Sequence, residues 1–237
     1  MSADIAYPAI HGNSTQLAVG RIPQTELNLT FDSSLLLADP YGARAEAFRA
    51  LRTQLVAQHL DDGKRALAVC GASPGIGCTF VATNLAIAFS QIGVRTLLID
   101  GDLRRPGVDQ LIRPDRPAAG LLECLVSPNM HLSDFIAGEV QPNLSVMFSS
   151  AAPNPQELLA ERRFRELLNF CLRNFDLTIV DTSPANNSSD SRLVASLLGY
   201  CLVVARRDKS SFADTKTLSE ELQTAGARIV GTVLNEG

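Results

Sequence analysis

The sequence contains no tryptophan, and aromatic residues make up 5% of its 237 positions. It also lacks an excess of positive charge: the net charge is −4, so the overall balance does not favour binding to nucleic acid. No apolar run reaches the ~18 residues that a membrane-spanning helix requires. The opening stretch, MSADIAYPAIHG, has neither the basic start nor the apolar block of a secretory signal. We therefore expect a soluble protein with no transmembrane segment of its own and no nucleic-acid partner.

The cysteines follow no metal-binding or disulfide pattern. There are five of them, an odd number, and no two form a CxxC pair: Cys70, Cys78, Cys124, Cys171 and Cys201. A structural zinc site needs closely spaced ligands, and a disulfide framework needs pairs. Free thiols of this kind are typical of a reducing compartment, so we predict a cytoplasmic protein.

Apolar strands that alternate with helical segments dominate the rest of the chain. The predicted strands are residues 66–70, 96–100, 144–150, 177–181, 200–206 and 228–234. The predicted helices are residues 43–59, 79–92, 107–113, 119–126, 131–137, 155–173, 188–197 and 213–225. Several strands are apolar without alternation, which is typical of strands covered on both faces. This order predicts an α/β fold with a parallel, doubly wound sheet and right-handed crossovers.

Residues 1–40 differ from the rest in composition. They mix Ser, Asn, Thr and Gln with three prolines and show little periodicity. We predict that 1–40 form a loose N-terminal segment and that 41–237 form one domain, since α/β folds of this length often fold as one unit.

Residues 71–79 read GASPGIGCT between a predicted strand and a predicted helix, which is the layout of a phosphate-binding loop. Gly75 and Gly77 permit positive φ, so the amides can converge on an oxyanion beside the helix dipole. Thr79 can offer its hydroxyl to Mg²⁺. The residue before it is Cys78, where such loops carry lysine. Taken alone, the stretch fits a tight strand–helix turn equally well.

Carboxylates follow two further predicted strands. LLIDGDLRRP (97–106) provides Asp100 and Asp102, and LTIVDTSP (177–184) provides Asp181. In a parallel sheet the carboxyl ends of strands form the ligand-binding edge, so we expect all three beside the loop. Paired carboxylates next to a phosphate site suit Mg²⁺ coordination or activation of a hydroxyl nucleophile. For the first segment, an acidic loop neutralised by its own arginines is the simpler alternative.

Together these segments resemble the cytoplasmic kinase domain of bacterial tyrosine autokinases, which are relatives of the ParA/MinD-type ATPases. Residues 97–104 match the Walker A′ motif of that family, D-x-D-x-R after an apolar run, and residues 179–184 match its Walker B motif, which ends D-x-x-P. Three more segments match family patterns: E-x-x-R-x-x-R at 46–52, N-P-x-E-L-L at 154–159 and G-x-V-L-N at 231–235. The likeness extends from about residue 40 to the C-terminus.

The resemblance implies a P-loop NTPase-like fold that binds ATP or ADP with Mg²⁺. It implies nucleotide-binding roles for Gly75, Ile76, Gly77, Cys78, Thr79 and Asn235. It implies catalytic roles for Asp100, Asp102 and Asp181, and metal binding by Thr79, Asp102 and Asp181. It also implies a homo-oligomeric ring formed through Glu46, Arg49 and Arg52, whose spacing we expect to place them on one helix face.

The resemblance further implies a role in exopolysaccharide or capsule synthesis and export. Members of this family work with a membrane chain-length regulator, or polysaccharide co-polymerase. We accordingly expect a cytoplasmic protein that lies at the inner membrane only through that partner.

Cys78 is the main departure from the family pattern. Two unit charges 4 Å apart interact by about 1 kcal/mol in water and about 4 kcal/mol at an effective dielectric constant of 20. The helix dipole contributes only about 0.3–1 kcal/mol. A thiol cannot replace the lysine, and a thiolate would repel phosphate. The nearest lysine in sequence, Lys64, precedes the strand, which leaves Arg104 as the cation that could compensate in space. We therefore predict weak or absent kinase and ATPase activity.

The tyrosines are a second departure. Autokinases of this family usually end in a tyrosine cluster, whereas this sequence ends Asn-Glu-Gly and contains only Tyr7, Tyr41 and Tyr200. Tyr200 falls in a predicted buried strand and Tyr41 just before the first helix. Tyr7 is the tyrosine that we expect to be exposed and able to accept a phosphoryl group.

Several alternatives stay open. Cys78 as a phosphatase-type nucleophile is excluded, because position 84 is Asn where that chemistry requires Arg. A redox role for Cys78 remains beside that of a small packed thiol. At the level of function, the alternatives to a kinase-like subunit of low activity are an active tyrosine autokinase or ATPase using Mg·ATP, and a ParA/MinD-like positioning ATPase.

Overall fold

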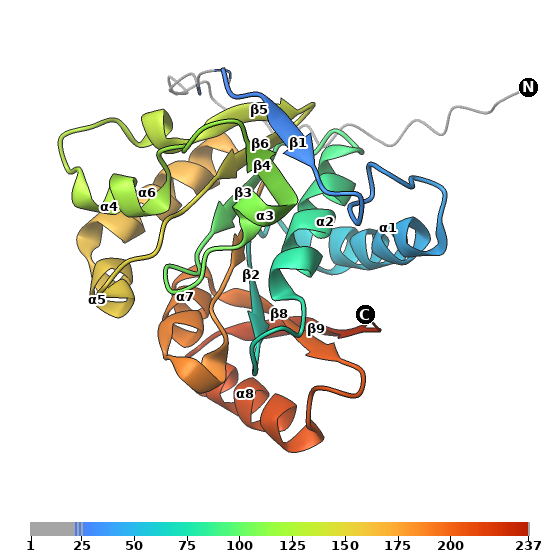
Figure 1. Cartoon of the computed structure of the whole chain (residues 1–237). Helices are drawn as coiled ribbons and strands as arrows, with labels where there is room; N and C mark the ends of the chain where they lie inside the picture. Colours follow the sequence, from blue (N-terminus) through green and yellow to red (C-terminus); the bar gives the residue numbers. More distant parts are fainter. Residues whose placement is uncertain (1–21, 23, 25, 237) are drawn as a thin grey trace, which may run out of the picture.

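The computed structural model of the chain describes residues 22, 24 and 26–236. At its centre lies a seven-stranded sheet (Figure 1). Its strands are, in spatial order, β5 (Ala137–Gln141), β6 (Leu144–Met147), β3 (Thr96–Asp100), β7 (Leu177–Asp181), β2 (Ala66–Gly71), β8 (Tyr200–Arg206) and β9 (Arg228–Asn235). Neighbours pair in parallel throughout, except for the antiparallel pair β5 and β6. The predicted parallel sheet is confirmed.

Helices cover both faces of this sheet (Figure 1). On one face, α1 (Ala43–Leu55) and α2 (Cys78–Ser90) bury side chains against Leu67 and Val69 of β2. On the other face, Ala68 and Cys70 of the same strand join a second core cluster. That cluster is completed by α4 (Leu121–Val126), α6 (Arg162–Asn174), α7 (Asp190–Leu198) and α8 (Phe212–Thr224). Side chains alternate across a strand, so apolar residues on both sides require two helical layers. The doubly wound architecture is confirmed.

The strand order positions the site. β2 lies between β7 and β8, and the chain passes from β2 through α2 to β3, on the far side of β7. β8 lies on the opposite side of β2. Such a reversal of direction leaves a crevice at the carboxyl ends of the strands, where ligands bind in open α/β sheets. The segments after β2, β3 and β7 are those that the sequence singled out.

Helix α2 is unusual in being apolar all round. Its sequence is CTFVATNLAIAFS, and residues 81–90 are all buried. A helix without a polar face belongs in the interior, and α2 lies between the sheet and α1. The helix begins at Cys78 directly after Gly77, so packing of its body fixes where the end of the glycine-rich loop points.

Part of the segment expected to be loose packs against the domain. β1 (Leu29–Phe31) pairs antiparallel with β4 (Ile112–Pro114), and neither strand was predicted. Leu35 and Leu36 are buried, and the amide of Leu36 donates a 2.8 Å hydrogen bond to Oδ1 of Asn84 in α2. Full burial of a leucine stabilises a fold by about 1.5–3 kcal/mol, which is reason enough for this segment to pack. Residues 1–21 lie outside the described part of the chain.

Several predicted elements have different bounds. The helix predicted over 155–173 is two helices, α5 (Pro155–Ala160) and α6, separated at Glu161, which is extended with ψ 157°. The two helices bury against different neighbours, α7 for α5 and the sheet for α6, so one straight helix cannot serve both.

Residues 132–135, predicted as part of a helix, form one turn of 3₁₀-helix, and β5 follows, where Glu139 has φ 52°. This positive φ and the shift in register interrupt the alternation of side chains, so the sequence of β5 shows no strand pattern. The helix predicted over 107–113 is confined to α3 (Val108–Leu111), and a π-helical turn (Val56–Leu60) follows α1.

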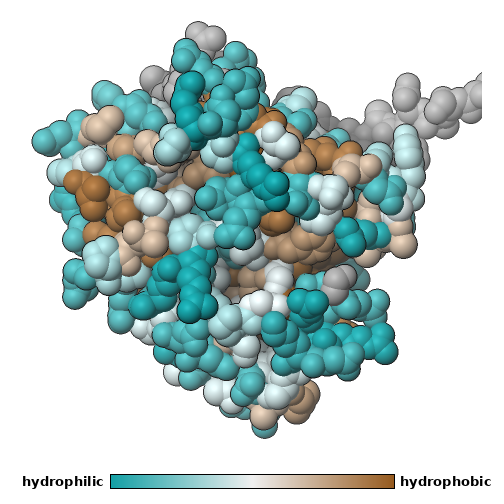
Figure 2. Space-filling model, in the orientation of Figure 1, coloured by the Kyte–Doolittle hydropathy of each residue, from teal (hydrophilic) through white to brown (hydrophobic). Residues whose placement is uncertain are grey.

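Hydrophilic residues dominate the face of the molecule shown in Figure 2, and hydrophobic residues appear there in smaller areas. Among the described residues, no helix combines the length and apolarity needed to cross a membrane.

Candidate nucleotide site

The glycine-rich loop has the backbone shape predicted for it. Gly75 and Gly77 have φ values of 71° and 96°, in the left-handed region that favours glycine. A Cβ atom at Gly77 would lie 2.3 Å from Nδ2 of Asn235, so a side chain there would also collide. Two such glycines turn the chain from β2 into α2 within six residues. The loop amides are therefore free to face an anion at the start of the helix.

Cys78 occupies the first turn of α2 and adds no positive charge. Its side chain is half-buried, and its Sγ lies close to Gly71, where an added Cβ would be 2.5 Å from the sulfur. Burial raises the pKa of the Cys78 thiol well above its usual range, and the negative charges of Asp181 and Asp102 raise it further. The thiol is thus neutral at physiological pH, which argues against a redox-sensing thiolate.

Asp100 holds the A′ turn (residues 101–107) in place. Its side chain is buried, and one oxygen accepts hydrogen bonds of 2.9 Å from the amides of Gly107 and Val108. The other accepts a 3.3 Å bond from the amide of Asp102. Burial raises the pKa of Asp100 to about 7, against the opposing effect of these amides. Both carboxylate oxygens of Asp100 thus accept backbone amides of the segment that follows β3.

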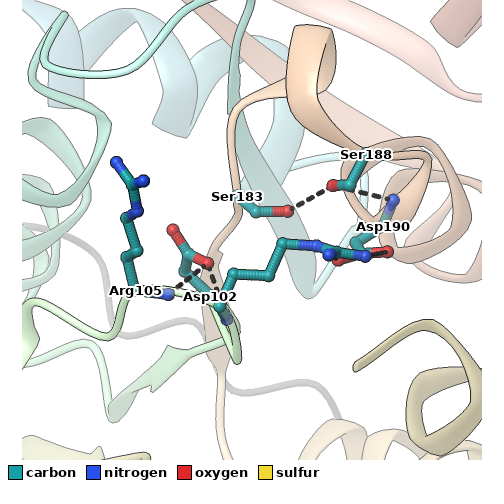
Figure 3. Close-up of polar contacts among 6 residues, drawn as sticks. Asp102, Arg105, Ser183, Ser188 and Asp190 are labelled. Atoms are coloured by element: carbon teal, nitrogen blue, oxygen red, sulfur yellow. Dashed lines mark hydrogen bonds and ion pairs between the residues drawn. The ribbon is translucent and has the colours of Figure 1, made fainter. Parts of the chain in front are cut away.

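Asp102 stands at the start of the same turn. Its Oδ1 accepts bonds of 3.0 Å from the amides of Arg104 and Arg105 (Figure 3). The guanidinium of Arg104 reaches a different carboxylate: its Nε lies 2.7 Å from Oδ2 of Asp190, a buried residue at the start of α7. Arg104 was the predicted substitute for the missing lysine. Because the Arg104 charge is paired with Asp190, the structure does not support a role for Arg104 in place of the lysine.

Asp181 is a buried carboxylate that stands next to the loop without hydrogen-bond partners of its own among the described residues. It ends β7 beside Asp100 of β3, is fully buried, and neither carboxylate oxygen has a hydrogen-bond partner in the described part of the chain. Burial raises the pKa of Asp181 well above its usual range. The charges of Asp100 and Asp102 add to this rise, and the nearby Thr79 hydroxyl opposes it. An ionised carboxylate without donors is costly to bury. A cation at this position would remove that cost.

The donor set fits Mg²⁺. Thr79 packs towards the A′ turn, since a Cβ added to Gly107 would lie 3.6 Å from the Thr79 hydroxyl oxygen. Thr79, Asp102 and Asp181 all offer hard oxygen atoms, which Mg²⁺ prefers. No cluster of three or more His, Cys, Asp or Glu side chains able to hold a metal occurs among the described residues. Mg²⁺ is usually held by one or two carboxylates, with water and phosphate oxygens completing its shell. A nucleotide would therefore have to supply part of the coordination.

The sequence did not reveal what covers the loop. Nδ2 of Asn235 donates a 2.9 Å hydrogen bond to the carbonyl oxygen of Ile76, so this residue, expected to face a base, also holds the loop. Arg206, the last residue of β8, and Lys209, in the turn after it, both donate to the carbonyl oxygen of Gly75, at 3.0 Å and 3.3 Å. The only signal for them was a basic stretch, RRDK, at a strand end.

The predicted ring residues of α1 do not share one face. Glu46 and Arg49 form an exposed ion pair of 3.3 Å, and Arg49 also donates to the carbonyl of Pro40. Arg52 is 9% exposed, and its Nη1 donates a 2.9 Å bond to the carbonyl of Ala88 in α2. Six residues along a helix of 3.6 residues per turn bring a side chain to about 120° from its start, so Arg52 can turn inward while Glu46 faces out.

The tyrosines also differ from expectation. Tyr41 is 93% exposed, so the prediction that Tyr7 is the one exposed tyrosine is wrong. Tyr200 is half-buried, with its ring 4.9 Å from that of His59 and the Lys64 ammonium over it. Tyr7 itself lies outside the described residues. The position of Tyr41 before α1 carried no sequence signal of burial or exposure.

Comparison with curated proteins identifies relatives that are named as tyrosine-protein kinases. EpsB of Ralstonia solanacearum is 35% identical over 191 residues, which cover 80% of this chain and 25% of EpsB. CapB of Staphylococcus aureus is 28% identical over 198 residues, which cover 83% of this chain and 86% of CapB. The chain therefore spans about a quarter of EpsB but most of CapB. No protein-family model matches the sequence.

Solved structures agree with these relatives. The kinase domain of the Escherichia coli tyrosine kinase ETK superposes with a TM-score of 0.78 at 33% identity, covering 85% of this chain and 79% of that domain. The chimeric protein CapA2B2 gives a TM-score of 0.78 at 30% identity, covering 86% and 90%. The cell-division ATPase MinD of Pyrococcus furiosus, at a TM-score of 0.62 and 24% identity over 72% of this chain and 71% of MinD, shares the fold.

Proposed function

Because this chain belongs to the family of bacterial tyrosine-protein kinases related to the ParA/MinD ATPases, we propose that it is a kinase-like regulatory subunit with weak or no phosphoryl-transfer activity. The proposed setting is exopolysaccharide or capsule synthesis and export. There it would act from the cytoplasmic side, held at the inner membrane by a chain-length regulator. The family supports the setting, and the site supports the low activity.

One observation carries the proposal: a neutral thiol stands where the family places a charged amine. Cys78 lies beside Asp102 and Asp181, whose negative charges oppose its ionisation. Arg104 is paired with Asp190, so a carboxylate already balances its charge. In phosphoryl transfer, catalysis consists largely of positioning and charge stabilisation, and one cation can be worth ~10³–10⁵ in rate. Its loss weakens the reaction far more than it alters the fold.

The remaining parts of the site support binding of a Mg·nucleotide. The loop amides and the start of α2 can hold phosphate oxygens, while Asp181, Asp102 and Thr79 can hold the metal. Mg²⁺, when bound, would supply the positive charge that lies between these carboxylates and the phosphates. Without it, Asp102 and Asp181 repel a polyphosphate, so binding should depend strictly on the divalent cation.

The direct test compares the wild type with Cys78→Lys. We expect the wild type to bind MgADP and to hydrolyse ATP at or near the background rate. Cys78→Lys should bind at least about tenfold more tightly, because it restores a charge against phosphate in an intact loop. Isothermal titration and a phosphate-release assay measure both quantities. Cys78→Ala, which removes the thiol without adding charge, is the matched control and should behave as the wild type.

Two outcomes would contradict the proposal. If the wild type hydrolyses ATP well above background and Asp181→Asn abolishes that activity, the alternative of an active autokinase or ATPase is correct. If neither the wild type nor Cys78→Lys binds nucleotide, the loop is a structural turn. A positioning ATPase of the ParA/MinD type has only the shared fold in its favour.

A further inference from the structure

Two cations from a distant part of the chain lie on the rim of the glycine-rich loop. The Nζ atom of Lys209 is 3.3 Å from the carbonyl oxygen of Gly75, and Nη1 of Arg206 is 3.0 Å from the same atom. Neither side chain forms an ion pair with a carboxylate anywhere in the part of the chain that the structure describes. Both positive charges thus contact the neutral carbonyl oxygen of Gly75, and no carboxylate among the described residues pairs with them.

A tight turn fixes this arrangement. β8 ends at Arg206, whose carbonyl accepts the amides of Lys209 and Ser210 at 3.2 Å and 2.9 Å. The Ser210 hydroxyl accepts the amide of Arg206 at 2.9 Å, and Asp208 adopts φ 58° at the tip. The turn is therefore closed by its own hydrogen bonds and presents Lys209 sideways to the loop.

Gly75 is what allows the ammonium so close. A Cβ atom at position 75 would lie 2.6 Å from Nζ of Lys209, so a side chain there would push the lysine away. Asp181, at the end of β7, lies near Cys78 and Thr79 where the loop enters α2, and its oxygens have no hydrogen-bond partner among the described residues. The loop therefore lies near Lys209, a cation without a carboxylate partner among the described residues, and near Asp181, a carboxylate suited to a metal ion. A Mg·polyphosphate requires both kinds of group.

We infer that Lys209 is the phosphate-binding cation of this site and takes the place of the lysine that the loop lacks at position 78. This inference rests on the proposed nucleotide site and names the residue that sustains it. An ammonium has three donors, so the single bond to Gly75 leaves two for a phosphate oxygen held by the loop. Lys209 is exposed and its four-carbon stem is flexible, which lets the ammonium move inward from the rim.

The position of Lys209 also shapes the activity. A lysine at position 78 would begin in α2 and be held by that buried helix. Lys209 approaches from a surface turn, across Gly75, and must lose side-chain freedom to reach the phosphates. Such a cation favours binding of a nucleoside diphosphate or triphosphate with Mg²⁺ more than the preorganised geometry of transfer. We therefore expect the site to bind a Mg·nucleotide while catalysing phosphoryl transfer only weakly.

Titration with MgADP tests the assignment. We expect Lys209→Ala to weaken binding about tenfold, as loss of one charge contact to phosphate should. Arg207→Ala is the matched control: it removes a charge from the same turn, but one that is paired with Glu236 at 3.5 Å, and it should change affinity less than about twofold. Arg105→Ala tests the competing cation, which extends from the A′ turn away from Asp190 (Figure 3). Adenosine, which has no phosphate, should bind Lys209→Ala and wild type equally.

A double-mutant cycle with Cys78→Lys separates the possible failures. Restoring the lysine at 78 should make Lys209 dispensable, so Lys209→Ala should cost less than about threefold in that background. If Cys78→Lys binds MgADP and the wild type does not, the nucleotide site stands and Lys209 is not its cation. If neither binds, the proposed function fails. Equal affinity of wild type and Lys209→Ala, or a loss confined to Arg105→Ala, would overturn the inference alone.

Discussion

Neither carboxylate oxygen of Asp181 has a hydrogen-bond partner among the described residues, and the burial of this carboxylate governs the response to pH that we expect. Burial raises the pKa of Asp181 well above its usual range and raises that of Asp100 to about 7, from an ordinary value of 3.8. The folded state therefore holds protons that the unfolded chain has released above pH ~4. The free energy of unfolding of the metal-free protein should fall as the pH rises from about 4 through 7.

Asp181→Asn tests this account at the scale of one residue. We expect the substitution to raise the free energy of unfolding at pH 8 by roughly 1–3 kcal/mol, because it removes a buried charge that lacks donors. The gain should shrink at pH 5, where the wild-type carboxyl is already protonated. The variant should also lose the thermal stabilisation that MgADP gives the wild type. Melting curves at both pH values, with and without MgADP, measure all three effects. An unchanged melting temperature at pH 8 would contradict the unbalanced charge.

At the scale of elements, Arg52 adds a polar contact to the apolar packing of α1 on α2. Arg52 donates to the carbonyl of Ala88, in the last turn of α2, where helical carbonyls lack partners of their own. The buried α2 must have these groups satisfied, because it has no polar face to expose them to water. Arg52 therefore serves packing within the subunit, in addition to any role between subunits.

We expect Arg52→Ala to lower the free energy of unfolding by about 1–3 kcal/mol, through the unsatisfied carbonyl of Ala88 and the lost packing. Arg49→Ala should have the smaller effect, less than about 1 kcal/mol, because its ion pair with Glu46 is exposed and its bond to the carbonyl of Pro40 is only partly buried. Urea denaturation of both variants beside the wild type provides the comparison. Equal stability of the two variants would show that the inward bond of Arg52 contributes nothing.

At the scale of the whole molecule, the proposed ring requires an outward face, and Glu46 and Arg49 provide it. Tyr41 is also exposed just before α1. Arg52 is unsuitable as a probe of assembly, since a change there would alter the subunit itself. Charge reversal at Arg49 perturbs the surface and leaves the core intact.

Sedimentation velocity at high protein concentration tests assembly. We expect the wild type to form a larger species and Arg49→Glu to shift the distribution towards the monomer. Arg162→Glu is the control, because Arg162 is an exposed residue of α6, on the opposite face of the sheet. A wild-type protein that remains monomeric, or an Arg162→Glu variant that dissociates equally, would count against a ring built on α1.

The sequence alone was sufficient for six of the seven strands of the central sheet and for the parts of the site that follow strands. Runs such as ALAVC and LTIVD are long enough and apolar enough to identify buried parallel strands, and their carboxyl ends meet by the geometry of that sheet. Glycine at 75 and 77 indicated positive φ for a local steric reason. The short strands β1, β4 and β5 left no pattern, because their pairing depends on neighbours rather than on alternation.

From the sequence, a glycine-rich loop with Cys78 in place of lysine could be expected beside Asp100, Asp102 and Asp181. The charged side chains that reach this loop depend on how distant segments fold together. The tertiary structure paired Arg104 with Asp190 and brought Lys209 to Gly75 across 134 positions of sequence. Backbone patterns are local and fix where a strand or turn lies. The direction of a long charged side chain follows from the packing of distant segments, which no local pattern records.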